Sequence, residues 1–329
     1  MNRLRFAAST VMALLLLSTQ PVFGADKKRS VDEIGNRKVA HRSIISEEKE
    51  IAIGKQYASE IDRSAKVITD PVVNEYVNRV AQNVARNSDL KIPLTVKVID
   101  SPEINAFALP GGFLYVNSGL VLAAEEEDQI AGVIAHEIAH VAARHWASQM
   151  TKLTFAQYAM LPLIFFPMSY PVYYGVMEAY MNGVPLAFLK FNRSAEAEAD
   201  YLGLQYMYKA GYDPNSYVGF FSKIIEQDRR SPGSIPTVFA DHPPTGERIL
   251  KAEAEIKEIL PGREQYLVST SEFDDVKARL KTVITARKDQ RRDSPTLKKR
   301  EPSDQTQTQP SNKGKDKGED KPPVLRRRD

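Results

Sequence analysis

The stretch Gln129–His145, QIAGVIAHEIAHVAARH, decides the fold of this chain. It is rich in alanine and isoleucine, and no glycine or proline interrupts residues 133–149, so a continuous helix is predicted there. His136 and His140 are four residues apart. On a helix they lie about 40° apart around the axis, and both can bind one metal ion. Glu137 lies between them, where it could act as a base.

This spacing is the H-E-x-x-H pattern of zinc hydrolases, in which Glu137 is the candidate general base. Catalytic zinc takes three protein ligands and keeps one position open. On a continuous helix His145 would lie on the opposite face, so it is not expected to share the ion. A third histidine ten residues after the first is ruled out because Trp146 stands there. Only His41 and His242 remain as histidines, so a carboxylate is the better third ligand.

Glu196 is the candidate carboxylate, and it lies in a segment that is predicted to be helical from residue 193 to Gly211. Asp200 follows one turn later, where its carboxylate could accept a hydrogen bond from the second ring nitrogen of a ligating histidine. Glu198 lies about 200° from Glu196 around the helix and is expected to point elsewhere. The alternative is a solvated acidic face formed by these three carboxylates.

Two stretches predict a small sheet. LTVKVID (94–100) alternates apolar and polar residues, and NAFALPGGFLYVNSGLV (105–121) places two β-prone runs around a Pro-Gly-Gly turn. YLVST (266–270) is a candidate for a further, terminal strand. A free strand edge can bind an extended peptide through main-chain hydrogen bonds, although the pattern alone favours an ordinary core hairpin. The candidate substrate-binding residues are Asn105, Ala106, Phe107, Ala108 and Leu109.

Helix starts can be predicted elsewhere. Ser46 precedes an acidic turn and is a candidate N-cap. Asp70 and Asp213 are each followed by a proline, which suits the first position of a helix.

Residues 153–177 contain no charged side chain but hold many aromatic residues and three prolines. The run is long enough to span a bilayer, but prolines break helices into short pieces. Three interpretations stay open for the wider segment 153–191: a buried helical hairpin, a mobile flap that touches a membrane or an apolar client, and, least favoured, a membrane span.

Composition narrows the class of protein. The 329 residues suffice for a sizeable core in one or two domains. Residues 287–329 have a net charge of +6. When they and the basic N-terminus are set aside, the remainder carries about −5, which argues against nucleic-acid binding. The chain has no cysteine, which excludes a disulfide, a thiol nucleophile and a cysteine-ligated zinc site.

The N-terminus indicates export. Residues 1–24 combine basic residues, a short apolar core and small residues at Val22 and Gly24, which is typical of a cleaved secretory signal peptide. An uncleaved anchor is the alternative. In a bacterium this signal would direct the protein to the periplasm or beyond, with membrane association as a further option.

Four segments, HEIAH, RSAEAEADYLG, NAFALPGGFLYVNSGLV and DHPPTGERI, occur in the order found in HtpX/CAAX-prenyl-protease-type zinc metallopeptidases. Over about residues 30–260 the chain resembles this family, and most of all its periplasmic subgroup. The resemblance implies an α+β, mainly helical, gluzincin-like domain with a small mixed sheet beside the zinc helix. It also implies one zinc ion per subunit, bound by His136, His140 and Glu196, with Glu137 as the base.

The resemblance further suggests that His242 lies in a loop near the metal, where it could block the zinc. In the expected mechanism the same histidine is also the candidate catalytic donor to the oxyanion. Two departures limit the resemblance. Membrane-embedded members carry clear spans that are not seen here, and a periplasmic relative has a C-terminal helical-repeat domain where this chain has a charged tail. The partner complex of that relative is therefore not carried over.

The expected layout is a signal peptide (1–24), an extended arm (25–45), a metallopeptidase domain (46–286) and a disordered charged tail (287–329). The expected function is a zinc-dependent endopeptidase of the cell envelope that degrades misfolded or unassembled proteins. A zinc-containing periplasmic chaperone with little turnover is the alternative. The expected partners are unfolded envelope proteins, with peripheral membrane contact through 153–191 and no nucleic acid.

Overall fold

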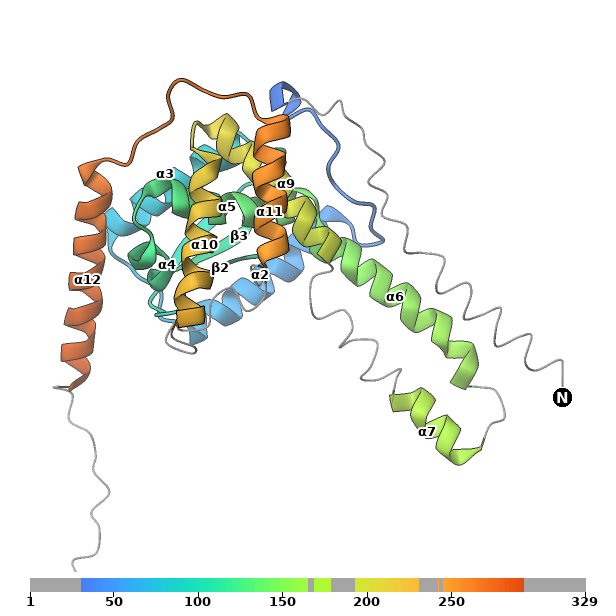
Figure 1. The fold of residues 1–329 in the computed structure, drawn as a ribbon. Coiled ribbons are helices and arrows are strands. Elements are labelled where there is room, and N and C mark those ends of the chain that lie inside the picture. The colour runs from blue at the N-terminus through green and yellow to red at the C-terminus, as the bar shows by residue number, and fades with distance from the viewer. Residues whose placement is uncertain (1–30, 165–168, 179–192, 231–241, 243–244, 293–329) are drawn as a thin grey trace, which may run out of the picture. The chain divides into compact units, whose positions relative to one another are not determined.

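The computed structural model describes residues 31–164, 169–178, 193–230, 242 and 245–292 (Figure 1). The predicted signal peptide lies outside the described residues, as do the predicted tail beyond residue 292 and much of the segment 153–191.

Helix α5 (Glu127–Ala142) lies at the centre of the hydrophobic core, and each of its residues from Ile130 onward is buried. Helices α3 (Pro71–Arg86), α9 (Arg193–Ala210) and α10 (Pro214–Arg230) pack against it, as does the strand β2 (Ala106–Leu109) (Figure 1). A helix that is covered on all sides needs apolar residues all round, which explains the composition of the stretch.

The predicted caps are present at the helix starts that flank this core. The Ser46 hydroxyl accepts a hydrogen bond from Lys49 N–H at the start of α2 (Glu47–Ser64). The Asp70 carboxylate accepts one from Val73 N–H in α3, whose first residue is the predicted proline. Each cap satisfies a backbone donor that has no partner within its helix.

The other helical elements are η1 (Val31–Glu33), α4 (Ser118–Ala123), α6 (His145–Ile164), α7 (Tyr170–Glu178), α11 (Gly246–Ile259) and α12 (Ser271–Arg292). Helix α12 buries Phe273, Val276 and Leu280 and extends six residues past position 286, where the domain was expected to end.

A three-stranded mixed sheet lies beside α5. Its strands are β1 (Thr95–Ile99), β2 (Ala106–Leu109) and β3 (Phe113–Asn117), in the order β1-β3-β2. Strand β3 pairs parallel with β1 and antiparallel with β2. The β2–β3 turn uses Gly111 and Gly112 at φ 80° and 84°, which glycine adopts without strain. The predicted mainly helical fold with a small mixed sheet is therefore confirmed.

The predicted terminal strand at 266–270 is wrong. Leu267 N–H donates to the carbonyl of Gly211, at the end of α9, and the run joins no sheet. Val268 is 84% exposed and Leu267 is 49% exposed, so this run lacks the half-buried face of a strand.

Beyond the buried first turn of α6, helices α6 and α7 carry exposed aromatic side chains. In the described part of this segment the large side chains with more than half of their surface exposed are Phe155, Tyr158, Tyr170, Val172 and Tyr174. Among the described residues, no helix is both long and apolar enough to cross a membrane.

The N-terminal segment is tied to the domain by a buried ion pair. The side chain of Arg37 is 2% exposed and that of Asp89 is fully buried, with Nη2 and Oδ2 2.6 Å apart. Arg37 also donates to Gln205 of α9, and Tyr206 of the same helix donates to Asp89. The pair therefore joins residues that lie far apart in the chain.

We predict that Arg37→Ala destabilises the domain by about 3–5 kcal/mol, because Asp89 is left as an uncompensated buried charge. The matched control is Arg230→Ala, which removes an exposed i,i+4 pair with Glu226 and should cost no more than about 0.5 kcal/mol. Urea unfolding monitored by circular dichroism measures both. Equal effects would contradict the structural role of the Arg37–Asp89 pair.

Candidate metal centre

Helix α5 presents two imidazoles to one point. The Nε2 atoms of His136 and His140 are 3.1 Å apart, and both residues are buried. Helix α9 brings Glu196 to the same point, with Oε2 3.5 Å from His136 Nε2 and Oε1 3.5 Å from His140 Nε2. Tetrahedral zinc with bonds of about 2.0–2.1 Å separates its ligand atoms by roughly 3.3 Å. The two histidines and the carboxylate therefore fit a zinc ion in donor type and spacing.

Close packing of α9 on α5 sets this spacing, and it depends on a glycine. A Cβ placed on Gly203 would lie 3.1 Å from the backbone nitrogen of His136 and 3.2 Å from its Cα. A larger residue would push α9, and with it Glu196, away from the histidine pair.

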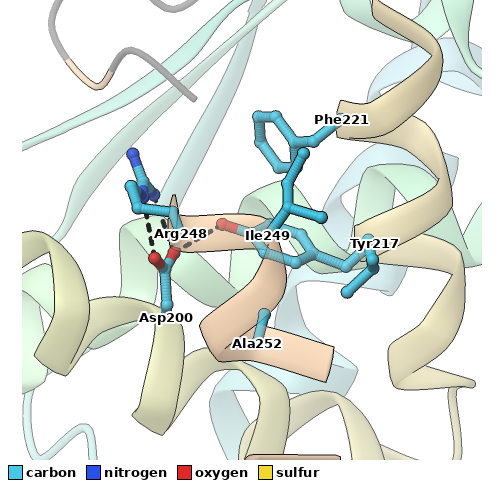
Figure 2. A pocket seen from close by; sticks show the side chains of 7 residues that line it. Asp200, Tyr217, Phe221, Arg248, Ile249 and Ala252 are labelled. Carbon is cyan, nitrogen blue, oxygen red and sulfur yellow. Dashed lines mark hydrogen bonds and ion pairs between the residues drawn. The ribbon is translucent and has the colours of Figure 1, made fainter. Parts of the chain in front are cut away.

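Asp200 lies behind His136 and holds its ring. Its Oδ1 is 3.0 Å from His136 Nδ1, it accepts a hydrogen bond from the Tyr217 hydroxyl at 2.7 Å, and it pairs with Arg248 at 2.7 Å (Figure 2). Burial alone would raise the pKa of Asp200, but the hydrogen bonds from Arg248 and His136 hold it well below its usual range.

Figure 2 shows the Arg248 side chain above the Asp200 carboxylate and the Tyr217 ring to its right, beside a small pocket. The pocket is lined by Asp200, Tyr217, Val218, Phe221, Arg248, Ile249 and Ala252.

The ionisable side chains of this cluster shift one another's pKa values. Burial would raise the pKa of Glu196, but its contacts with His136 and His242 outweigh burial and lower that pKa to about 2. Burial would lower the pKa of His136, but Asp200 and Glu196 outweigh it and raise that pKa to about 9. A metal ion that binds His136 must therefore displace a proton and take over its role as counter-charge.

Glu137 faces both the metal cluster and the sheet. Its Oε2 accepts a hydrogen bond from Ala108 N–H of β2 at 3.0 Å. Its Oε1 is buried and has no hydrogen-bond partner among the described residues. Burial raises the pKa of this carboxyl, which moves it toward the range that suits a general base at neutral pH.

Strand β2 leaves one backbone edge unpaired with β3. Asn105 C=O accepts a hydrogen bond from Asn117 N–H, whereas Ala108 N–H is directed away from β3 to Glu137. Since successive residues of a strand point their backbone groups to opposite sides, Ala106 and Ala108 direct theirs away from β3, and Phe107 and Leu109 bond to β3. Ala106 is fully buried, so the accessible part of this edge is at Ala108. The predicted substrate-binding run thus forms the edge strand beside Glu137.

His242 reaches the same cluster from the loop before α11. Its Nδ1 is 2.6 Å from Glu196 Oε1, and its ring centroid lies 4.6 Å from that of His140 and 5.4 Å from that of His136. Arg248 donates to its carbonyl oxygen at 3.2 Å. Four residues, His136, His140, Glu196 and His242, each offer one candidate ligand atom, and these four atoms all lie within 4.8 Å of one another.

The predicted continuous helix over 133–149 is wrong. Helix α5 ends at Ala142, and α6 begins at His145. Between them Arg144 adopts φ 55°, the left-handed region that residues with a side chain rarely enter. The chain therefore reverses at a position that no glycine marks.

The reversal brings His145 back to the metal cluster instead of away from it. Arg144 is held by Glu50, at 2.8 Å, and by the carbonyl of Ile45, also at 2.8 Å. As a result His145 Nδ1 lies 2.9 Å from His140 Nδ1. His145 still does not belong to the four-residue cluster, because it faces the far nitrogen of His140.

Five residues around the site were given no role in the site by the sequence-based prediction. Arg248 and Tyr217 both contact Asp200, while Glu198 contacts His41 and His145. Arg248 lies in the quoted DHPPTGERI segment, which was a usable signal. The other contacts join separate elements and leave no local signature.

A helix that carries H-E-x-x-H, with a second-helix glutamate completing the ligand set, defines the class of metallopeptidases. The profile of peptidase family M48 matches residues 71–256, and the chain belongs to that family.

The similar proteins include bacterial and mitochondrial metallopeptidases. The beta-barrel assembly-enhancing protease of Escherichia coli is 28% identical over 83% of this chain and 55% of its own length. The mitochondrial metalloendopeptidase OMA1 of Schizosaccharomyces pombe is 34% identical over 57% of this chain and 55% of its own. OMA1 of Arabidopsis thaliana is 32% identical over 48% of this chain and 32% of its own length. The chain thus spans about half the length of the first two, and less of the third.

We predict that Gly203→Ala destabilises the domain by about 1–3 kcal/mol and weakens metal binding, because α9 must move off the backbone of His136. The control is Gly219→Ala in α10, where an added Cβ meets nothing within 4 Å and should stabilise by about 0.4–1 kcal/mol. Urea unfolding and chelator competition for Zn²⁺ provide the two measurements. Gly203→Ala with unchanged metal affinity would contradict this account of how α9 places Glu196.

Proposed function

We propose that this protein is a zinc-dependent endopeptidase of the cell envelope that degrades misfolded or unassembled envelope proteins. The observation that carries the proposal is the meeting of His136, His140 and Glu196 at one buried point beside Glu137 and an open strand edge. Membership of family M48 supports the peptidase activity. The name of the E. coli relative supports an envelope location and an envelope substrate.

Each residue of the site would have a separate role in peptide hydrolysis. A zinc ion held by His136, His140 and Glu196 would polarise the scissile carbonyl and lower the pKa of a water molecule. Glu137 Oε1, which is buried and unpartnered among the described residues, is placed to take the proton of the attacking water and pass it to the leaving amine. Asp200 holds the ring of His136 in orientation.

The edge of β2 would hold the substrate. An extended peptide can add as a strand at the partly exposed end of this edge, through the outward N–H and C=O groups of Ala108, and main-chain bonding of this kind tolerates many side chains. The hydrogen bond from Ala108 N–H to Glu137 must then be exchanged for one to substrate. This exchange would free the carboxylate at the moment when a peptide arrives.

His242 would close the site in the resting enzyme. With this residue the cluster offers four protein ligands, and a zinc site with four protein ligands has no open position for chemistry. His242 must withdraw before a peptide is cleaved. In its other expected role it donates a hydrogen bond to the oxyanion of the tetrahedral intermediate.

A second candidate function is a zinc-containing chaperone that binds clients with little turnover. The exposed aromatic side chains of α6 and α7 favour it, because an exposed apolar surface is typical of protein or membrane contact. The same surface is our candidate for peripheral membrane contact. Glu137 weighs against a pure binding protein, which needs no base at this position.

We predict that Glu137→Gln retains zinc and lowers casein cleavage by at least about 100-fold, because the base is lost while the ligands are kept. Metal analysis and a casein assay measure the two effects. The control is Glu226→Gln, an exposed residue of α10 that should change neither. A Glu137→Gln protein that cleaves at the normal rate would contradict the role of Glu137. If it protects a client as well as the parent protein does, and the parent turns over no substrate, the chaperone function is favoured.

We predict that His242→Ala keeps zinc and raises kcat, by about tenfold if the closed state is favoured by about 1.4 kcal/mol. The reason is that removal of the fourth ligand opens the site, while His136, His140 and Glu196 remain to bind the ion. Casein cleavage at saturating zinc is the measurement. A fall in kcat would instead assign His242 to stabilisation of the oxyanion and rule out the closed resting state.

A further inference from the structure

A second group of polar side chains meets next to the metal cluster. His41 Nε2 and His145 Nε2 lie 2.7 Å and 3.3 Å from the same atom, Glu198 Oε2. On its other side the ring of His145 faces a metal-cluster residue, with His145 Nδ1 2.9 Å from His140 Nδ1. The contacts therefore run without a break from His140 to His41.

Three separate segments build this group. His145 begins α6 directly after the reversal at Arg144, Glu198 lies on α9, and His41 lies in the N-terminal segment. The N-terminal segment is fixed there by His41 N–H, which donates to Ala143 C=O at 3.0 Å. His145 is buried, whereas the side chain of His41 is 41% exposed. The group thus links the metal cluster to the protein surface.

The protons of the three rings can be assigned from the contacts. If His140 binds a metal through Nε2, its ring is neutral and its single proton is on Nδ1. That proton points toward His145 Nδ1, 2.9 Å away, which is then the acceptor. The proton of a neutral His145 is consequently on Nε2 and points at Glu198. His41 Nε2–H donates to the same carboxylate oxygen.

The same assignment argues against a second metal ion in this group, although His41, His145 and Glu198 have the spacing for one. To bind a metal through Nε2, a neutral His145 would carry its proton on Nδ1. His140 would then have to accept at Nδ1 and carry a proton on Nε2, where its own metal should be. With neutral rings, the two sites exclude each other.

We propose that His145, backed by Glu198, is a positioning residue that fixes the tautomer and ring orientation of His140. The proposal rests on the metal site of the proposed function and deepens it. It assigns to His140 what Asp200 supplies to His136, namely an acceptor for the nitrogen that faces away from the metal. Outer partners of this kind orient the ligand and raise its basicity.

The test is metal affinity of the purified full chain, measured with Zn²⁺ and Co²⁺ by competition with a chelator, together with the visible spectrum of the Co²⁺ form. We expect His145→Ala to weaken binding roughly 10- to 100-fold and to change the Co²⁺ spectrum. His145→Asn should recover most of the affinity, because its Oδ1 can accept near the position of Nδ1. A structural role alone would not give this rescue.

Two further variants test the same role of His145 if His145→Ala does not fold. Glu198→Ala should weaken binding about tenfold, since His145 loses its acceptor. His41→Ala should weaken it no more than about fivefold, since its pair is exposed. The control is Ser43→Ala, which removes a hydrogen bond from the same N-terminal segment to Ala147 C=O in α6 and leaves His41, His145 and Glu198 unchanged.

Unchanged metal affinity in His145→Ala and Glu198→Ala would overturn the proposal. So would two metal ions per chain in the parent protein that fall to one in His41→Ala, because the group would then be a metal site. Casein cleavage at saturating zinc separates the peptidase function from the positioning role of His145. A parent protein that binds zinc but does not cleave casein refutes the peptidase function, and the role of His145 is then judged by metal affinity alone. A parent protein that binds no metal refutes both.

Discussion

The buried carboxylate of Asp200 constrains the whole domain, because a charge taken out of water costs several kcal/mol unless it is paired and hydrogen-bonded. Its partners come from three other helices: His136 from α5, Tyr217 from α10 and Arg248 from α11. These helices must therefore meet at one point on α9. The metal cluster lies one helical turn away, at Glu196, so the packing that satisfies Asp200 also sets the ligand geometry.

The two faces of α5 serve different needs. One face carries the histidine pair toward α9, where Gly203 permits a close approach of the two helices. The other places Glu137 against the edge of β2, where a backbone N–H holds one carboxylate oxygen and leaves the other unpartnered among the described residues. The candidate ligands His136 and His140 and the candidate base Glu137 are thus held in register by a single rigid helix, which suits preorganised chemistry.

Much of the framework could be predicted because its causes are local. The caps at Ser46 and Asp70 satisfy donors three residues away, and the glycine pair at the β2–β3 turn follows from its positive φ angles. The continuous helix after Ala142 was wrong for the opposite reason. The left-handed backbone of Arg144 is imposed by Glu50, 94 residues earlier in the chain.

The sequence by itself determined the histidine pair, since helical periodicity places residues four apart on one face whatever surrounds them. It also determined the apolar centre at α5 and the hairpin around Gly111 and Gly112, and it singled out Glu196 as the candidate carboxylate, whereas the edge position of the hairpin's first strand came from the tertiary structure. The tertiary structure alone decided that Arg248 and Tyr217 meet at Asp200, and that His145 turns back onto His140. Contacts of this kind join distant segments, and they depend on packing distances and on backbone reversals that no local pattern of residues encodes.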